Sequence, residues 1–414
     1  MKLDTAEILK VFGNTFSQLI IRFSGAGTTF LVTLFLARFL GVDTLGSFIK
    51  VTSFVAIFYL LIDFGLNTIY LKDYFHKTEE LFGNLLLLRF LISSSVFLLV
   101  LAIAVFLPHT ENSGYSIAEK IGILIYSFTI FTEGILVSFN GLLQKNLLQK
   151  KLVMPSLASS VVTILLVLLG VWAHNLFIIL ASYPIGELVQ VSAISISLKN
   201  KVSYKRLPAS FRSFSRKSLF AASPLALMLF LNVVYFRADS FILALLKSAT
   251  DVGLYGFSYK VFEFLISVPT FLSASVFPIL IAVHADRKLF RQKIFSYAGI
   301  LLAVSGILTG AVFLLSPLVS LVRSDLAPAV IPLRILSFSL PFFFLTSLFQ
   351  WAILLQGKIK LLLFIYGITM VLNVILNVLY IPVFSYIASS YITLATEGLV
   401  FLLMLMVFLT SKKN

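Results

Sequence analysis

The chain has 414 residues, of which 59% are hydrophobic and only 12% charged, with a net charge of +15 and no cysteine. Soluble domains carry about 25% charged residues, so lipid rather than water must surround much of this chain. The composition therefore excludes a soluble protein, disulfide or thiolate chemistry, and nucleic-acid binding, because the basic residues fall in short clusters between apolar runs instead of sharing one surface.

Apolar runs of about 20 residues, the length of a membrane-spanning helix, recur along the whole sequence. The first run is too long for the core of a signal peptide and has no small-residue cleavage site, so we expect it to remain as a helix. We predict an all-α membrane protein with about twelve transmembrane helices. They are expected at residues 13–40, 47–71, 83–107, 119–143, 153–172, 176–198, 219–246, 253–283, 294–315, 329–354, 361–380 and 387–410.

The lysines and arginines between these runs are distributed unevenly. Twenty-two of them fall in one alternate set of connections and the termini, whereas only Lys247 and Arg323 fall in the other set. Because loops on the cytoplasmic side carry the excess of basic residues, we expect both termini to lie in the cytoplasm.

The predicted connection at 199–218 is the longest and lies at the midpoint, with six predicted helices on each side. We predict an N-terminal six-helix lobe at 1–198, a basic cytoplasmic linker at 199–218 and a second lobe at 219–414, arranged around a central cavity. The linker's charges act as a topology signal or lie against anionic lipid headgroups. A short internal repeat, GSFIKV at 46–51 and GFSYKV at 256–261, agrees with this duplication.

Several short motifs resemble a known family. Residues 37–48 read ARFLGVDTLGSF and residues 63–66 read DFGL, while the second half contains DSFIL at 239–243, VGLY at 252–255 and FP at 277–278. Together these resemble the bacterial polysaccharide-export, or O-antigen-type, flippases of the MATE-like (multidrug/oligosaccharidyl-lipid/polysaccharide) superfamily.

The resemblance implies an alternating-access carrier that moves an undecaprenyl-pyrophosphate-linked oligosaccharide from the cytoplasmic to the periplasmic leaflet of the bacterial inner membrane. It also implies a cationic central cavity, function as a monomer, membrane lipids as neighbours and association with polysaccharide polymerase machinery. We expect an H+ or Na+ gradient to drive transport, with no other cofactor.

Eight basic residues lie within the predicted helices or at their ends. A charge at the bilayer centre costs roughly 2.5–3.5 kcal/mol, so such residues usually face a cavity or a partner. Arg38 and Lys120 lie near outer ends, where their long side chains reach the interface. The other six either bind the substrate diphosphate, in which bidentate guanidinium contacts are favourable, or form ion pairs between helices. These candidates are Arg22, Lys50, Arg89, Arg237, Lys260 and Arg334.

Acidic residues within the predicted helices are candidates for ion coupling, because a buried carboxyl group can carry a proton or bind a cation. The alternative is a hydrogen-bonded structural role. Lys260 and Glu263 are three residues apart on one helix face, so we expect them to pair, whereas Arg237 and Asp239 do not face each other. The coupling candidates are Glu133, Glu187, Asp239, Glu263 and Glu397.

Two other functions compete with a lipid-linked sugar flippase. A MATE-type exporter of cationic drugs needs a site lined by carboxylates, against which the many basic residues in the helices argue. A membrane enzyme is not expected, because the outer loops are short and the sequence shows no nucleophile, metal-ligand spacing or phosphate-binding glycine loop. The four histidines include no H-x-x-x-H pair, so we predict no metal site.

Overall fold

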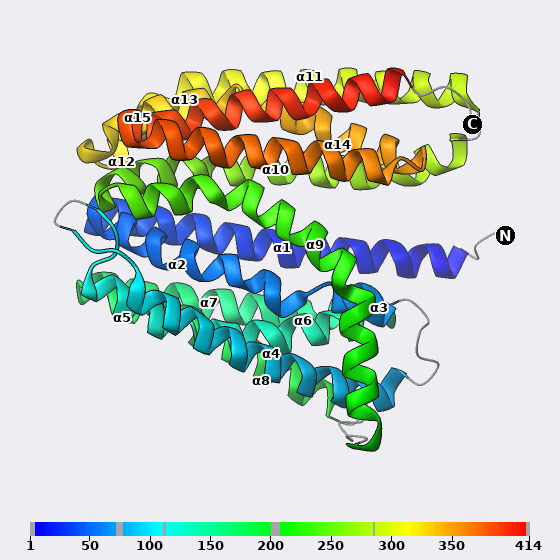
Figure 1. The fold of residues 1–414 in the computed structure, drawn as a ribbon, viewed down its shortest axis with the longest axis horizontal. Coiled ribbons are helices and arrows are strands. Elements are labelled where there is room, and N and C mark those ends of the chain that lie inside the picture. The colour runs from blue at the N-terminus through cyan, green and yellow to red at the C-terminus, as the bar shows by residue number, and fades with distance from the viewer. Residues whose placement is uncertain (1–4, 72–77, 111–112, 200–207, 285, 411–414) are drawn as a thin grey trace. The chain divides into compact units, whose positions relative to one another are not determined.

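The computed structural model describes residues 5–71, 78–110, 113–199, 208–284 and 286–410 (Figure 1). Within these ranges the chain is helical and contains no strand. The helices of the first half are α1 (Thr5–Phe35), which continues as a π-helix at Leu36–Leu40, α2 (Val42–Asp63), α3 (Leu66–Leu71), α4 (Thr78–Phe106), α5 (Ile117–Tyr126), α6 (Thr129–Lys145), α7 (Lys150–Trp172) and α8 (Leu176–Leu198).

The described residues of the second half are also helical. Short 3-10 turns at Ser316–Leu318 and Ser324–Ala329 join three of its helices. The helices are α9 (Pro208–Leu246), α10 (Ala249–Val283), α11 (Arg287–Leu315), α12 (Val319–Val322), α13 (Val330–Ser337), α14 (Leu340–Leu355) and α15 (Ile359–Leu409).

The predicted all-α membrane fold is confirmed. Among the described residues, ten helices are long and apolar enough to cross a membrane. Three predicted spans consist of two consecutive helices each: α2 with α3, α5 with α6, and α13 with α14. Two others, 361–380 and 387–410, form the single long α15, which is divided at Ser385 by a non-helical backbone with φ 51° and ψ −140°.

Two predictions reach beyond the described residues. The linker at 199–218 is described only in part, and from Pro208 onward it forms the start of α9. Several basic residues that indicate the orientation, among them Lys72, Lys77 and Lys412, lie outside the described ranges. The cytoplasmic location of both termini therefore stays a prediction.

Contacts divide the described residues into two compact units. Unit 1 lies within Met1–Phe35, Val51–His109 and Tyr115–Phe230, and unit 2 within Leu36–Lys50, Thr110–Gly114 and Leu231–Asn414. In unit 1, α7 packs along α8 and α1, and α4 packs against α6. In unit 2, α14 packs against α15, α11 and α10. Helices α2 and α9 each contribute to both units.

Side-chain caps complete several helix ends. Ser116 begins α5 with a reciprocal capping box, in which its Oγ accepts from Glu119 N at 3.2 Å and its N donates to Glu119 Oε2 at 2.7 Å. Asn175 Oδ1 accepts from Phe177 N at 2.9 Å at the start of α8, and Asp286 caps α11 in the same way. These contacts satisfy backbone N–H donors that the first turn of a helix leaves without an intrahelical partner.

Large apolar side chains cover much of the outer surface. Phe106 is 85% exposed, Trp172 81% and Leu314 77%. Exposure of this kind is unfavourable in water but is expected where lipid tails are the solvent. The polar side chains buried inside the units are therefore the first candidates for a functional site.

Candidate functional site

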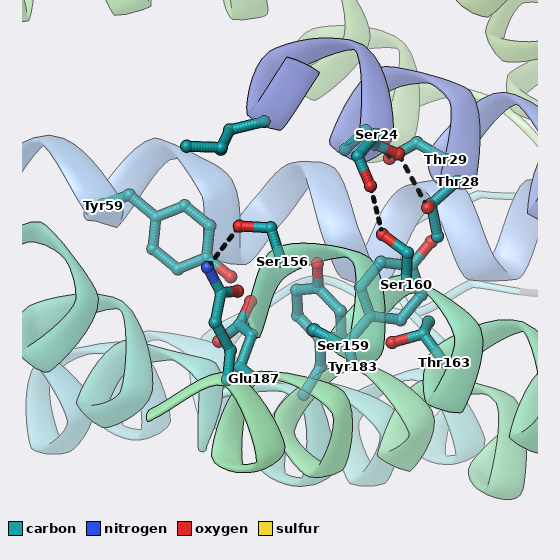
Figure 2. A pocket seen from close by; sticks show the side chains of 14 residues that line it. Ser24, Thr28, Thr29, Tyr59, Ser156, Ser159, Ser160, Thr163, Tyr183 and Glu187 are labelled. Atoms are coloured by element: carbon teal, nitrogen blue, oxygen red, sulfur yellow. Dashed lines mark hydrogen bonds between the residues drawn. The ribbon is translucent and has the colours of Figure 1, made fainter. Parts of the chain in front are cut away.

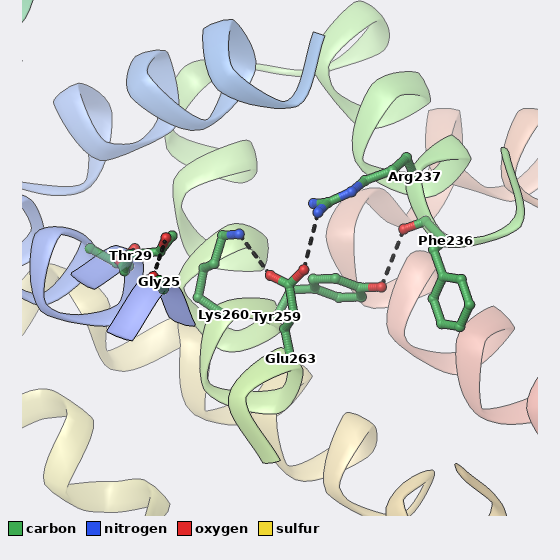
Figure 3. Close-up of polar contacts among 8 residues, drawn as sticks. Gly25, Thr29, Phe236, Arg237, Tyr259, Lys260 and Glu263 are labelled. Atoms are coloured by element: carbon green, nitrogen blue, oxygen red, sulfur yellow. Dashed lines mark hydrogen bonds and ion pairs between the residues drawn. The ribbon is translucent and has the colours of Figure 1, made fainter. Parts of the chain in front are cut away.

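Two basic residues of unit 2 converge on one carboxylate. Glu263 on α10 accepts from Arg237 Nη2 on α9 at 3.1 Å through Oε1, and from Lys260 Nζ at 2.7 Å through Oε2 (Figure 3). The side chain of Arg237 is 26% exposed, that of Lys260 is 19% exposed and that of Glu263 is 34% exposed. The predicted Lys260–Glu263 pair is confirmed, and the cluster carries a formal charge of +1.

The neighbouring Asp239 does not join this cluster, as its spacing from Arg237 predicts. It is 3% exposed and its Oδ1 accepts from Ser240 N at 2.6 Å, while the Tyr255 hydroxyl donates to Oδ2. Tyr259, one residue before Lys260, donates instead to the Phe236 carbonyl at 3.2 Å (Figure 3). Asp239 therefore bonds a backbone amide and an aromatic hydroxyl group, and it interacts with Arg237 only through space.

Glu397 is the second buried acid of unit 2. Its side chain is 3% exposed and accepts from Tyr235 Oη at 2.8 Å and from Thr346 Oγ1 at 2.7 Å. Nearby on α15, Asn373 Nδ2 donates to Thr396 Oγ1 at 3.2 Å. Among the described residues, neither Glu397 nor Asp239 forms an ion pair with a basic side chain. Neutral hydroxyl groups bind Glu397, whereas Asp239, which bonds a backbone amide and a tyrosine hydroxyl, also interacts electrostatically with Arg237.

In unit 1 a buried arginine joins three helices. Arg89 on α4 is 1% exposed and donates to Asp63 Oδ1 at 3.2 Å, Asn67 Oδ1 at 2.9 Å and Ser138 Oγ at 3.0 Å. The DFGL motif explains this geometry, because Asp63 ends α2 and Gly65, at φ 71°, turns the chain so that α3 presents Asn67. Arg89 therefore links α4 to side chains of α2, α3 and α6.

A polar pocket of about 310 Å³ lies among α1, α2, α5, α7 and α8 of unit 1 (Figure 2). Ser24 Oγ lies 2.8 Å from Ser160 Oγ across it, and Gln190 Nε2 donates to Ser156 Oγ at 2.8 Å. None of its lining residues is basic, and one, Glu187, is acidic. The lining consists of Ile21, Ser24, Gly25, Thr28, Thr29, Tyr59, Tyr126, Ser156, Ser159, Ser160, Thr163, Tyr183, Glu187 and Gln190.

The acid in this pocket belongs to a larger acidic group. Thr132 Oγ1 donates to Glu187 Oε2, and the carboxyl groups of Glu187 and Glu133 interact electrostatically. Glu133 also interacts with Asp63 and Arg89. Three carboxyl groups and one guanidinium therefore belong to one network within unit 1, which the sequence did not indicate because the residues lie on four helices.

The remaining predicted cations have separate surroundings. Arg22 is exposed on α1. Lys50 is 3% exposed and donates to the Gly114 carbonyl at 2.7 Å. Arg334 donates through Nε to Ser316 Oγ at 2.8 Å and lies 4.5 Å from the centre of the Phe313 ring. Of the six cations predicted to bind substrate, the structure brings Arg237 and Lys260 onto one carboxylate, and the roles of all six stay predictions.

The sequence matches the profile of a family described as polysaccharide biosynthesis protein over residues 11–284, which is 274 of the 414 residues. The chain belongs to the polysaccharide biosynthesis protein family. A second profile, MatE, matches residues 224–379. The resemblance seen in the short motifs is therefore confirmed, and this family member is a multi-pass membrane protein of the superfamily that contains both flippases and MATE transporters.

Similar proteins agree with this assignment. An uncharacterised membrane protein of Methanocaldococcus jannaschii is 26% identical over 307 residues, which cover 71% of this chain and 72% of the relative. The lipid II flippase MurJ, in an inward closed conformation, superposes with a TM-score of 0.74 at 16% identity, over 97% of this chain and 88% of MurJ. An inward-facing multidrug resistance MATE transporter gives a TM-score of 0.70 at 13% identity, over 96% of this chain and 100% of the transporter. The two structures establish the fold that this family member shares.

Proposed function

We propose that this protein translocates an undecaprenyl-pyrophosphate-linked oligosaccharide from the cytoplasmic to the periplasmic leaflet of a bacterial inner membrane by alternating access. The observation that carries the proposal is the convergence of Arg237 on α9 and Lys260 on α10 on the carboxylate of Glu263. The family assignment supports a role in polysaccharide biosynthesis, and the fold is shared with a lipid II flippase.

The cationic cluster suits a diphosphate for electrostatic reasons. A guanidinium group offers five N–H donors in a planar fork and an ammonium group three, so both can contact phosphate oxygens in addition to Glu263. Glu263 holds the two cations at a fixed separation and lowers the cost of placing them in the membrane. A diphosphate entering the cluster would meet a preorganised positive site, while its lipid tail stays in the bilayer.

Ion coupling is assigned to acids that hydroxyl groups surround. Glu187, with Glu133 beside it, and Glu397, with Asp239 in the same unit, have oxygen-rich neighbourhoods that can accept H+ or Na+. Glu263, also a predicted coupling residue, is engaged by two cations, and we assign it to positioning them. The protein would act as a monomer, with polysaccharide polymerase machinery as its partner in the membrane.

The test is transport of a fluorescent polyprenyl-diphosphate sugar by the full-length protein in proteoliposomes under an H+ or Na+ gradient. We expect Arg237→Gln and Lys260→Gln each to reduce the initial rate at least tenfold with unchanged reconstitution. Arg323→Gln is the matched control, because it removes a half-exposed ion pair of the same unit, in which the side chains are 39% and 43% exposed. Transport equal to that of empty vesicles would contradict the proposal.

A MATE-type cation exporter is the second candidate function. The hydroxyl-lined surroundings of Glu397 favour it, as does the MatE profile match. Uptake of a fluorescent organic cation into the same vesicles distinguishes the exporter from the flippase. Dye transport that requires Glu397 but not Arg237 would favour the exporter, whereas sugar-lipid transport that requires Arg237 favours the flippase.

A further inference from the structure

The first part of α9 is an amphipathic helix whose apolar face packs on unit 1. Phe214 is 5% exposed and Ala222 is fully buried, and both join the hydrophobic core formed by α3, α4, α6, α7 and α8. In Figure 1 this part of α9 runs across the direction of α4 and α8, which belong to the same unit. The packing fixes both the position and the rotation of the helix.

The opposite face of this helix carries a concentrated positive charge. Arg212, Arg216 and Lys217 are exposed and, with Ser213 and Phe220, line an open pocket of about 730 Å³. Among the described residues, none of the three cations takes part in an ion pair. The sequence contains no acidic residue from position 208 to 238, so the charge is not neutralised along the helix.

Apolar side chains stand directly beside these cations. Phe220, one turn after Arg216, is 83% exposed, and Leu227 in the following turns is 60% exposed. A cationic face that faced only water would not need a phenylalanine as exposed as Phe220. Arginine and lysine next to an exposed aromatic ring are typical of the boundary between phospholipid headgroups and acyl chains.

The sequence predicts that this face lies on the cytoplasmic side. The helix follows the basic connection after α8, and the same set of connections holds 22 basic residues. The cytoplasmic leaflet is also where anionic lipids attract basic segments. A soluble anion would account for the charges but not for Phe220, and a nucleic acid would require a larger basic surface.

We propose that the pocket formed by Arg212, Arg216, Lys217 and Phe220 binds the headgroup of an anionic phospholipid in the cytoplasmic leaflet. The guanidinium groups and the ammonium group would contact the phosphate oxygens, and Phe220 would lie against the glycerol and the start of the acyl chains. This site lies in unit 1 and does not depend on the identity of the transported cargo.

Native mass spectrometry of the purified full-length protein tests the proposal by titration with short-chain phosphatidylglycerol and with phosphatidylcholine of equal chain length. We expect phosphatidylglycerol to bind more tightly, and Arg212→Gln/Arg216→Gln/Lys217→Gln to weaken that binding by about tenfold to hundredfold. The charge-matched control is Lys288→Gln/Arg291→Gln/Lys293→Gln at the start of α11, which should leave the binding within about twofold of the wild type. Equal losses in both variants, or equal affinity for the two lipids, would overturn the proposal.

Two further measurements keep the test independent of folding defects. Phe220→Ser retains every charge, and we expect it to weaken phosphatidylglycerol binding without affecting the weak binding of inorganic phosphate. In the wild-type protein, added salt should weaken phosphatidylglycerol binding. If inorganic phosphate displaced phosphatidylglycerol as effectively as the lipid itself does, the pocket would be a site for a free anion instead. No cargo is present in these measurements, so their failure is distinguishable from failure of the flippase proposal.

Discussion

Gly46 on α2 lies so close to Ala249 on α10 that a Cβ atom on Gly46 would be 1.7 Å from the Ala249 carbonyl oxygen. Gly253 makes the reciprocal approach, with its Cβ position 2.3 Å from the Val42 carbonyl oxygen. Gly46 belongs to the internal repeat, and its counterpart in the second copy, Gly256, faces Ile49. The two repeat segments therefore pack against each other within unit 2, and absent side chains allow the close backbone contact.

Gly46→Ala should destabilise the protein. The methyl group meets backbone, which cannot rotate away as a side chain does, so we expect a loss of about 1–3 kcal/mol and a Tm lower by several degrees. Gly299→Ala on α11 is the control, because no heavy atom lies within 4 Å of its Cβ position. Fluorescence-detected melting in detergent measures both, and identical Tm values would contradict the close contact.

Asp63→Asn should cost more stability than the loss of a surface pair. Arg89 is 1% exposed and would lose its ion pair while keeping its charge, whereas Asp63 is 35% exposed and Glu133 still interacts with Arg89, so both moderate the effect. We expect a loss of about 1–3 kcal/mol. Asp325→Asn, which breaks the half-exposed pair with Arg323, should cost about 0–1 kcal/mol. Melting temperatures of the two variants, measured side by side, would contradict this ranking if they fell equally.

Glu397→Gln and Glu187→Gln separate the two candidate coupling acids. Glutamine keeps the shape of the side chain and one acceptor oxygen, which can accept from Thr132 at position 187 and from either Tyr235 or Thr346 at position 397, but it cannot carry a proton. We expect the variant at the coupling acid to lose its response to an imposed ion gradient. The response is measured as the ratio of the transport rate with the gradient to the rate without the gradient. The other variant should keep that ratio within about twofold.

Glu119→Gln is the control for these acids. Glu119 is also buried, at 3% exposed, but it serves the capping box with Ser116, a role that glutamine can fill. We expect unchanged gradient dependence and a Tm within about 2 °C of the wild type. If this variant lost coupling as well, the assignment of coupling to hydroxyl-lined acids would be wrong.

Reporter fusions test the predicted orientation. A fluorescent protein that folds only in the cytoplasm should be bright when fused after Asn414, and alkaline phosphatase should be active when inserted after Ser113. The reason is the imbalance of 22 basic residues against two between the alternate connections. The reverse result at both positions would place the α9 cationic face outside the cell and would also remove the lipid-headgroup proposal.

The candidate site was predictable only where local spacing governs it. Lys260 and Glu263 are three residues apart on one helix, a spacing that brings side chains together. Arg237 and Asp239 are two residues apart, a spacing that points them in different directions. The partners of Arg237 and Arg89 are each 26 residues away on another helix. The periodicity of one helix does not indicate which residue of a neighbouring helix a given side chain will contact.

The sequence by itself determined the solvent, the spanning helices and the family. An apolar run in lipid must satisfy its backbone N–H and C=O groups by hydrogen bonds within its own helix. Its length and composition are therefore sufficient to predict a helix, and the family motifs indicate the family. Only the tertiary structure decided which charges meet, as Arg89 pairs with Asp63 and as Arg237 and Lys260 converge on Glu263. That choice depends on the rotation and crossing of packed helices, which arises from contacts summed over their whole lengths.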